Sequence, residues 1–175
     1  GLVVPKGWRK NARFEDMDRY LTAAASSFDW RTWPGGNVPV RNQGSCGSCW
    51  AFGTVAPLEA LLGVHCGKSV DLSEQYIVSC NHSGWGCQGG WFAHDYHEWL
   101  IPTGKGETDF GAVLETAFPY ISYNVSRGGT HAHPYKISDW RFVGSNHGVP
   151  TPAAIKQAIE YYGPVSVADG VGRQF

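Results

Sequence analysis

The sequence lacks an excess of either charge: its 14 Lys and Arg residues face 15 Asp and Glu residues, and the formal net charge is -1. A nucleic-acid-binding surface needs a basic field and a membrane-surface protein needs a polybasic run, so both classes are excluded. The apolar runs are also far shorter than the roughly 18–20 residues that cross a bilayer. We therefore expect no nucleic-acid partner and no membrane partner.

The first ten residues, GLVVPKGWRK, lack an apolar stretch of signal-peptide length. We expect any targeting segment to have been removed or never to have been present. Charged residues are scarce, at 17% against 42% hydrophobic residues, which indicates a folded globular protein. The 175 residues suffice for one domain with a core or for two small lobes. The eight Trp, eight Tyr and eight Phe residues suit core packing, and some would suit a groove for extended peptide.

The cysteines are odd in number, at five. Four would form two disulfides, as in a protein from an oxidising compartment, and one thiol would remain. Cys46 and Cys49 lie three apart in QGSCGSCWAF, directly before a stretch typical of a helix. This spacing fits a redox pair, part of a zinc site, or a structural cysteine beside a nucleophile.

Apolar periodicity and start signals predict three helices, over 49–63, 73–80 and 91–100, with Gly63 ending the first. Thr151, Pro152 and Gly163 predict a fourth helix over 152–162. Alternation in GPVSVAD predicts a strand from residue 164. Helices followed by strands indicate an α+β fold with two lobes that meet at a cleft.

Residues 1–25 differ from the rest of the chain. Phe14, Met17 and Leu21 lie at helical spacing, flanked by small residues. This pattern fits a docking arm, a remnant of a pro-segment or a linker.

Cys49 stands where the first predicted helix begins. A helix N-terminus stabilises a thiolate through its unpaired backbone N–H groups and its dipole. The Cys49 amide and the side-chain amide of Gln43 can together hold an oxyanion, as acyl transfer requires. Gly44 and Gly47 let the backbone approach closely. The pattern favours nucleophilic catalysis by Cys49.

The other interpretations of the cysteines fit less well. A redox pair uses the same spacing at a helix start, but the surrounding chain shows no thioredoxin-like strand-helix-strand opening. A zinc site would add Cys80 and Cys87, which have six intervening residues in place of the usual two to four. Purely structural cysteines would explain neither the odd count nor the glycine-rich setting. We expect no metal and no organic cofactor.

Three motifs, QGSCGSCWAF, LSEQYIVSC and GCQGGW, occur in the order and at the intervals of the papain-like cysteine peptidases. FDWR, FPY and GPVSVA resemble further landmarks of that family, and the resemblance covers roughly residues 26–168. It implies a papain-like two-lobe α+β fold, with a helical left lobe and a partial β-rich right lobe. The peptidase domain would span 26–175, after an N-terminal extension over 1–25.

The resemblance also implies roles for single residues. Cys49 would be the nucleophile and Gln43 the oxyanion donor, while a Cys46–Cys87 disulfide would tie the active-site loop to the GCQGG loop. The backbone of two glycines and a pocket of three side chains would bind substrate: Gly89, Gly90, Trp91, Phe92 and Ala168.

The sequence departs from the family in its cysteines and histidines. The usual partner of Cys80 lies further downstream, and no cysteine follows Cys87, so we predict a variant Cys66–Cys80 bridge. The family's catalytic His and Asn would fall at about positions 179–199, beyond Phe175. None of the histidines present matches the family's motif: His65, His82, His94, His97, His131, His133 and His147. We expect His94, His131 and His133 to face solvent.

The resemblance implies a cysteine-type endopeptidase that hydrolyses an extended peptide or protein through a Cys49 thioester. A segment beyond residue 175 or a second chain would carry the His and Asn, and a pro-segment or inhibitor would occupy the cleft. The alternatives are an inactive papain-like peptide-binding protein and, third, a redox protein that uses Cys46 and Cys49.

Two sequons begin at Asn81 and Asn124 and predict glycosylation. With the predicted disulfides, they suit a secreted protein or one from a lysosome- or vacuole-like oxidising compartment.

Overall fold

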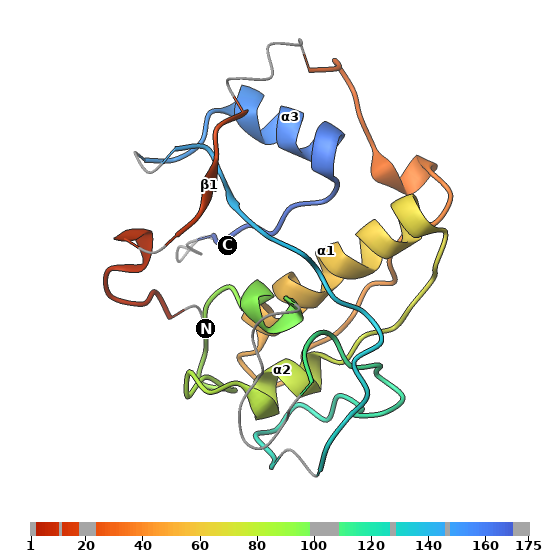
Figure 1. Cartoon of the computed structure of the whole chain (residues 1–175), viewed down its shortest axis with the longest axis vertical. Coiled ribbons are helices and arrows are strands. Elements are labelled where there is room, and N and C mark those ends of the chain that lie inside the picture. Colours follow the sequence, from red (N-terminus) through yellow and green to blue (C-terminus); the bar gives the residue numbers. More distant parts are fainter. Residues whose placement is uncertain are drawn as a thin grey trace.

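The computed structural model describes residues 3–10, 12–17, 24–98, 109–126, 129–145 and 148–169. Its elements are η1 (Trp8–Lys10), β1 (Phe14–Glu15), η3 (Trp30–Thr32), α1 (Cys49–Cys66), α2 (Glu74–Cys80), η4 (His94–His97), β2 (Phe142–Val143) and α3 (Pro152–Tyr162). Figure 1 shows α3 and β1 at one end of the molecule, α2 at the other, and α1 between them. Helices and strands together confirm the α+β prediction.

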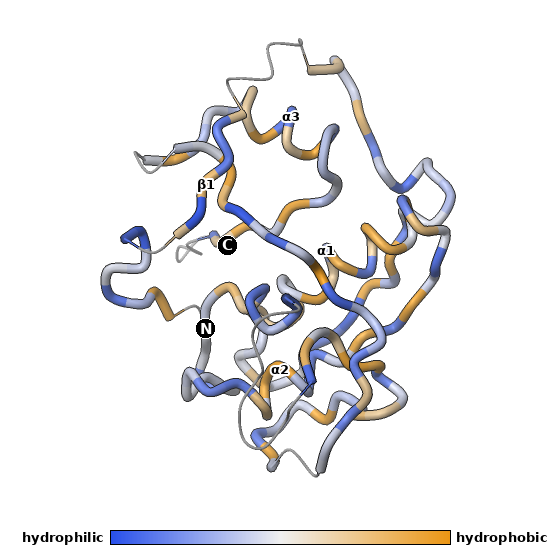
Figure 2. Tube along the Cα trace, viewed as in Figure 1, coloured by the Kyte–Doolittle hydropathy of each residue, from blue (hydrophilic) through white to orange (hydrophobic). Residues whose placement is uncertain are grey.

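Helix α1 lies at the centre of the main hydrophobic core. Its residues Val55 and Leu58 share that core with Tyr76 and Ile77 of α2. Hydrophobic residues follow most of the course of α1 in Figure 2, and 44% of the helix is buried inside the protein. By length and composition alone α1 is long and apolar enough to cross a membrane, a property that core helices share.

Gly63 does not end α1, contrary to the prediction, because the helix continues to Cys66 and ends at the left-handed Gly67. Gly63 serves a different purpose. A Cβ atom at this position would lie 1.9 Å from the carbonyl oxygen of Gly35. The absence of a side chain therefore lets α1 contact the loop at Gly35 backbone to backbone.

Replacing this glycine tests the contact. We expect Gly63→Ala to lower the free energy of unfolding by about 3 kcal/mol, because overpacking forces the two backbones apart. Gly53→Ala is the matched control in the same helix, because a Cβ at Gly53 meets nothing within 4 Å. It should stabilise the helix by up to about 1 kcal/mol. Urea unfolding measures the free energy of unfolding of both variants. Equal urea midpoints for Gly63→Ala and Gly53→Ala would contradict a close backbone contact between Gly63 and Gly35.

Helix α3 begins and ends as predicted. The Thr151 hydroxyl accepts a hydrogen bond from the backbone N–H of Ala154 at 3.1 Å, and Gly163 follows the last turn. Ala154 and Ala158 on its buried side form a second, smaller core with Met17. The N-terminal segment is therefore packed against the second half of the chain.

The helical spacing of Phe14, Met17 and Leu21 does not produce a helix at residues 14–15. Phe14 and Glu15 form β1, which pairs in parallel with β2 and aligns Phe14 with Phe142. The edge of β2 supplies backbone hydrogen bonds that outweigh the local helical spacing. Leu21 lies outside the described residues.

Two further elements differ from the predictions. Of the helix expected over 91–100, the described residues form only the single turn η4, and residues 99–100 lie outside the description. No strand forms over residues 164–169, because the described chain offers no neighbouring strand to pair with them. The described part of the second lobe therefore holds less strand than predicted.

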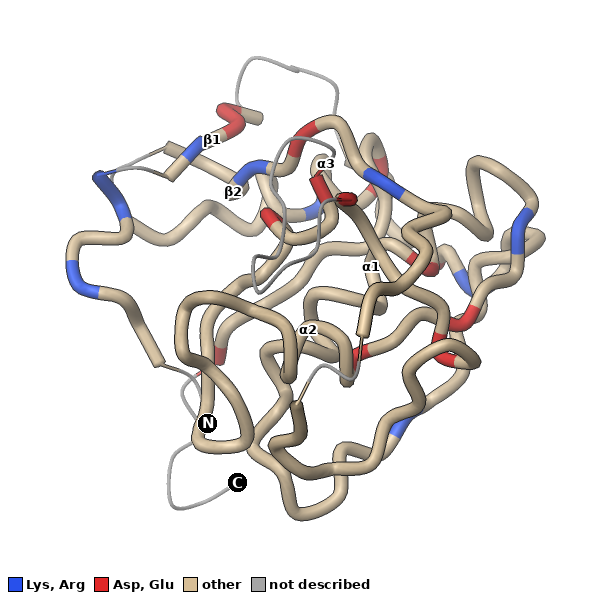
Figure 3. The backbone as a smooth tube through the Cα atoms, turned by 60° about the horizontal axis from the view of Figure 1, so that its bottom comes forward, with Lys and Arg blue, Asp and Glu red and all other residues tan. Residues whose placement is uncertain are grey.

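Figure 3 shows the Lys and Arg residues dispersed over the molecule. Several pair with carboxylates, as Arg41 does with Asp71 at 2.8 Å.

Candidate active site

Cys49 is the first residue of α1, and its thiol is exposed. The carbonyl of Ser48 begins the helix by accepting hydrogen bonds from the N–H groups of Ala51 at 2.8 Å and Phe52 at 3.3 Å. The N–H of Cys49 belongs to the first helical turn, where the backbone offers no intrahelical acceptor. An exposed sulfur thus lies beside an N–H donor at the positive end of a long helix.

Gln43 lies on the loop that leads into α1. Its Nε2 donates to the carbonyl of Cys46 at 2.9 Å, which uses one of the two N–H groups of the amide. Gln43 and Cys49 also line the same pocket. The second N–H of the amide is not used by the bond to Cys46.

Tyr120 holds this loop in place, a role that the sequence did not reveal. Its hydroxyl donates to the carbonyl of Gln43 at 2.8 Å and lies 2.5 Å from the hydroxyl of Ser48, which is fully buried. Its ring packs edge-on against Phe52, with centroids 4.9 Å apart. The FPY motif that contains Tyr120 was the only signal in the sequence.

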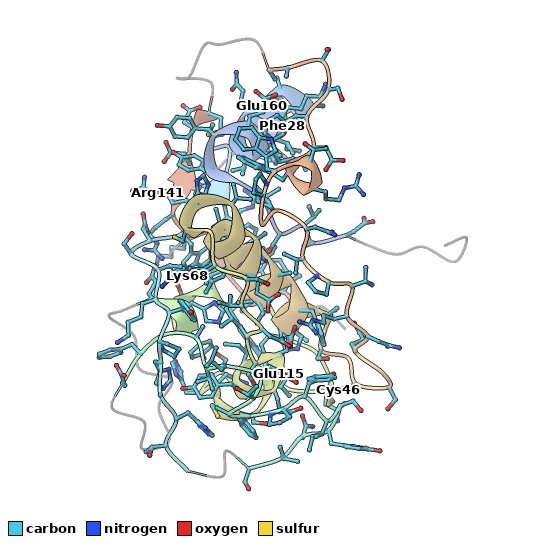
Figure 4. All side chains as sticks on the ribbon, turned by 90° about the vertical axis from the view of Figure 1, so that its right-hand side faces the viewer. Phe28, Cys46, Lys68, Glu115, Arg141 and Glu160 are labelled. Carbon is cyan, nitrogen blue, oxygen red and sulfur yellow. A yellow bond between two sulfur atoms is a disulfide. The ribbon has the colours of Figure 1, made fainter. Side chains whose placement is uncertain are left out.

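The predicted Cys46–Cys87 disulfide is confirmed. Two hydrogen bonds reinforce it: the N–H of Gly47 donates to the carbonyl of Cys87 at 2.9 Å, and Trp50 Nε1 donates to the carbonyl of Gly86 at 3.2 Å. Figure 4 shows Cys46 below the N-terminal end of α1. The disulfide therefore fixes the 86–90 loop next to the start of the helix.

Gly89 and Gly90 complete this loop. Gly89 has φ +128° and exchanges two backbone hydrogen bonds with Gly86. A Cβ at Gly90 would lie 2.5 Å from the Trp50 ring, so only glycine fits. The carbonyl of Gly90 accepts a hydrogen bond from the N–H of Val3 at 2.7 Å. The N-terminal arm, described over residues 3–10 and 12–15, thus lies with Val3 on the loop predicted to bind substrate.

Trp91 and Phe92 follow directly, with ring centroids 5.0 Å apart. Trp91 is 9% exposed, and the Trp8 ring of the arm packs against it at 5.4 Å. Ala168 is exposed near the end of the described chain, so its predicted place in the pocket stays a prediction.

A pocket of about 350 Å³ opens beside Cys49. Cys49, Phe52, Ala56 and Glu59 line it from α1, so it follows that helix for about 15 Å. Glu74 of α2 also lines it, and burial raises the pKa of Glu74 to about 8. Burial raises the pKa of Glu59 as well.

No described histidine lines this pocket. His133 is buried, contrary to the prediction, because its Nδ1 bonds the carbonyl of Gly111 at 2.8 Å. His94 is half-buried against Phe92 and Trp140, and desolvation lowers its pKa to about 4. His131 is also half-buried, stacked on Phe118. These side chains are held in the fold, away from the sulfur.

The predicted Cys66–Cys80 bridge is wrong, because Cys66 and Cys80 are both thiols in the structure. Cys66 is the exposed last residue of α1, and Cys80 is the buried last residue of α2. Figure 1 shows the C-terminal end of α1 pointing away from α2, and a disulfide requires Cα atoms within about 7 Å.

The predicted glycosylation of Asn81 is also wrong. This side chain is 2% exposed, and its amide donates to the carbonyls of Ile77, Val78 and Trp85. A glycosylated amide could not stay in this site. Asn124 is exposed and accepts a hydrogen bond from the N–H of Cys87 at 2.8 Å, so its glycosylation stays a prediction.

Comparison with curated proteins finds clear relatives. Zingipain-1 from Zingiber officinale is 37% identical over 155 residues, which cover 85% of this chain and 62% of the relative. Zingipain-2 from the same plant is 34% identical over 151 residues, with the same coverage. The chain thus spans about 62% of the length of these relatives.

Comparison with solved structures also finds proteins of similar fold. A structure from work on the mite allergens Blo t 1 and Der p 1 matches with a TM-score of 0.70 at 25% identity, over 89% of this chain and 49% of the other. Digestive procathepsin L 3 from the larval midgut of Tenebrio molitor matches with a TM-score of 0.67 at 25% identity. The match covers 87% of this chain and 46% of the other. The Carica candamarcensis cysteine protease CMS1MS2, solved in complex with E-64, matches with a TM-score of 0.56 at 30% identity. The match covers 77% of this chain and 58% of the other.

A family model described as papain family cysteine protease matches residues 24–175, which include the loop at Gln43, the helix at Cys49 and the GCQGGW loop. The match therefore covers every residue of the candidate site. The chain belongs to the papain family of cysteine proteases.

Proposed function

We propose that this chain supplies the nucleophile and the oxyanion donors of a cysteine-type endopeptidase. The observation that carries the proposal is an exposed Cys49 thiol at the start of α1, in one pocket with Gln43. The Cys46–Cys87 disulfide holds the substrate loop beside it. Because Cys46 is bonded to Cys87, it does not pair with Cys49, which argues against the redox alternative.

The reaction begins when Cys49 Sγ attacks the carbonyl carbon of the scissile peptide bond. The carbonyl oxygen takes up the electron pair and accepts hydrogen bonds from the Cys49 N–H and the Gln43 side-chain amide. The carbon–nitrogen bond then breaks, the amine leaves with a proton from a histidine, and a thioester remains. Water, deprotonated by the same histidine, attacks the thioester and releases the acid and the thiolate.

The histidine and its asparagine partner would come from a segment beyond residue 175. Two observations support this part of the proposal. No described histidine lines the pocket at Cys49, and the chain spans about 62% of the length of the zingipains. An inactive peptide-binding relative is the competing interpretation, and it would bind peptides at the same loop without hydrolysing them.

Binding of E-64, the inhibitor present in the CMS1MS2 structure, tests the site. We expect E-64 to protect Cys49 from iodoacetamide while the exposed thiol of Cys66 is still labelled. Peptide mapping by mass spectrometry locates the label, and the exposed Cys66 serves as the internal control. Equal labelling of Cys49 with and without E-64 would contradict a papain-type site.

We also propose that residues 1–25 are the remnant of a pro-segment that competes with substrate. The hydrogen bond from Val3 to Gly90 and the packing of Trp8 on Trp91 support this role, since both contacts use residues predicted to bind substrate. The procathepsin L 3 structure, which contains a proform, also supports it.

Trp8→Ala tests the arm. The substitution removes ring contacts with Trp91 and Phe142, so we expect E-64 to protect Cys49 at a lower concentration than in the parent chain. Trp33→Ala is the matched control, because Trp33 is 50% exposed and packs on Phe28 and Trp30 instead. If Trp8→Ala and the parent chain need the same concentration of E-64 to protect Cys49, the arm does not compete for the site.

The Cys46–Cys87 disulfide supports an oxidising compartment, whether extracellular, lysosomal or vacuolar.

A further inference from the structure

Segment 120–124 contacts both loops of the candidate site. The Tyr120 hydroxyl donates to the carbonyl of Gln43 at 2.8 Å. The side-chain oxygen of Asn124 accepts a hydrogen bond from the N–H of Cys87 at 2.8 Å. Gln43 carries the proposed oxyanion donor, and the disulfide at Cys87 holds the loop predicted to bind substrate. One short segment therefore contacts the oxyanion loop and the substrate loop together.

Ser122, in the middle of this segment, lies against both loops. Its φ angle is +57°, in the left-handed region that residues other than glycine rarely adopt. A Cβ at Gly44, the residue after Gln43, would lie 3.3 Å from the Cβ of Ser122. The sulfur of Cys87 lies 3.8 Å from the carbonyl oxygen of Ser122. A backbone in this conformation persists only where the surrounding structure holds it.

Gln75 of α2 holds the segment from inside the core. Its side chain is fully buried. Its Oε1 accepts a hydrogen bond from the N–H of Ile121 at 3.0 Å, and its Nε2 donates to the carbonyl of Tyr123 at 2.9 Å. Nε2 also donates to Ser79 Oγ at 3.0 Å, within the same helix. The amide thus uses both N–H groups and its oxygen, and two of its three bonds hold segment 120–124.

Side-chain packing contributes little to holding the middle of this segment. Ile121 is 47% exposed and Tyr123 is 66% exposed. Hydrogen bonds to a buried amide are stronger than those in water, because the protein interior has a low dielectric constant. Loss of the Gln75 amide should therefore let segment 120–124 shift.

We propose that Gln75 is a positioning residue for the peptidase site and acts through segment 120–124. Gln75 does not line the pocket at Cys49, so it takes no direct part in the reaction. Its hydrogen bonds fix the segment that holds Gln43 and the loop at Cys87. The inference rests on the proposed function, because it concerns how the oxyanion donor and the substrate loop are placed.

Gln75→Met tests the role, because methionine fills a similar space without the amide. In the protein that carries the segment beyond residue 175, we expect kcat for a fluorogenic peptide to fall by about 10–100-fold. A misplaced catalytic group can cost a factor of this size. Ser79→Ala is the matched control, because it removes the bond within α2 and leaves both bonds to segment 120–124. Its kcat should stay within about twofold of the parent.

The buried thiol of Cys80 separates positioning from loss of folding. Cys80 is the last residue of α2, so its reaction with iodoacetamide reports any opening of that helix. In Gln75→Met, we expect Cys80 to stay unlabelled while kcat falls. Labelling of Cys80 in proportion to the loss of kcat would mean that the substitution opens α2, and this result would overturn the positioning role.

A double-mutant cycle tests the route through the segment. Tyr120→Phe removes the hydroxyl that contacts Gln43. If Gln75 acts through this segment, the double variant should have a kcat within about twofold of the slower single variant. If the two losses multiply instead, Gln75 acts independently of Tyr120, and the inference is overturned.

Asn124 offers a test that does not depend on a change in the core. Asn124→Ala removes the bond to Cys87 at an exposed position, so we expect KM to rise by about 2–10-fold, as loss of one hydrogen bond implies. Asn124→Asp keeps an oxygen acceptor and is the matched control, with KM close to that of the parent. Equal KM values for Asn124→Ala and Asn124→Asp would overturn the link between the segment and the substrate loop.

The inference and the proposed function fail in different ways. If E-64 protects Cys49 but Gln75→Met and Ser79→Ala have equal kcat, this inference fails and the proposed function stands. If E-64 gives no protection in the parent protein, the proposed function fails, and the positioning role fails with it.

Discussion

Cys49→Ala should reduce peptide hydrolysis by about 10⁴-fold or more in the protein that carries the segment beyond residue 175. The thioester cannot form without the sulfur, and losses of this size follow removal of a nucleophile in hydrolases of this kind. Steady-state kcat with a fluorogenic peptide measures the loss. Stability should change little, because Cys49 is exposed at the start of α1.

Cys66→Ala is the matched control, since it removes the other exposed thiol at the opposite end of the same helix. It should leave kcat within about twofold of the parent, as surface substitutions away from a site usually do. Residual hydrolysis in Cys49→Ala close to the parent value would mean that another group performs the chemistry.

Gln43→Ala should lower kcat by about 10²–10³-fold, with a smaller change in KM. Its side-chain amide lies in the pocket with Cys49 and has one N–H that is not used by the Cys46 carbonyl. An oxyanion forms only after the substrate carbonyl is attacked, so the missing donor raises the barrier more than it weakens substrate binding.

A second readout separates this catalytic role from a structural one. Alkylation of Cys49 by iodoacetamide passes through no oxyanion, so Gln43→Ala should leave its rate within about twofold. An equal fall in hydrolysis and alkylation would mean that Gln43 acts by holding the loop at Cys46 in place. Tyr120→Phe is the variant expected to show that second pattern, because Tyr120 bonds the backbone of Gln43 and the hydroxyl of Ser48.

Local motifs predicted the surroundings of Cys49 well. The start of α1, the cap of α2 at Ser73 and the cap of α3 at Thr151 all depend on hydrogen bonds within a few residues, which a sequence pattern encodes directly. The Cys46–Cys87 disulfide was predicted from the family resemblance, because it connects two motifs that occur together.

Features that depend on distant contacts were predicted poorly. Phe14 had helical spacing, but pairing with Phe142 made it part of a strand. Gly63 resembled a helix stop, and its real constraint is the contact with Gly35. The Cys66–Cys80 bridge failed because counting cysteines does not reveal where two helices end in space. Asn81 carried a sequon, yet four hydrogen bonds bury its side chain in a turn.

The central claim is that Cys49 is a reactive thiolate, and its alkylation rate as a function of pH tests this most directly. Iodoacetamide labelling from about pH 4 to about pH 9, in the protein that carries the proposed histidine segment, compares Cys49 with an ordinary thiol that titrates near pH 8.5. The account predicts fast labelling of Cys49 that persists well below that pH, while Cys66 follows the ordinary thiol titration. Labelling of Cys49 that falls away in step with Cys66 would contradict a papain-type nucleophile and leave the chain as an inactive relative.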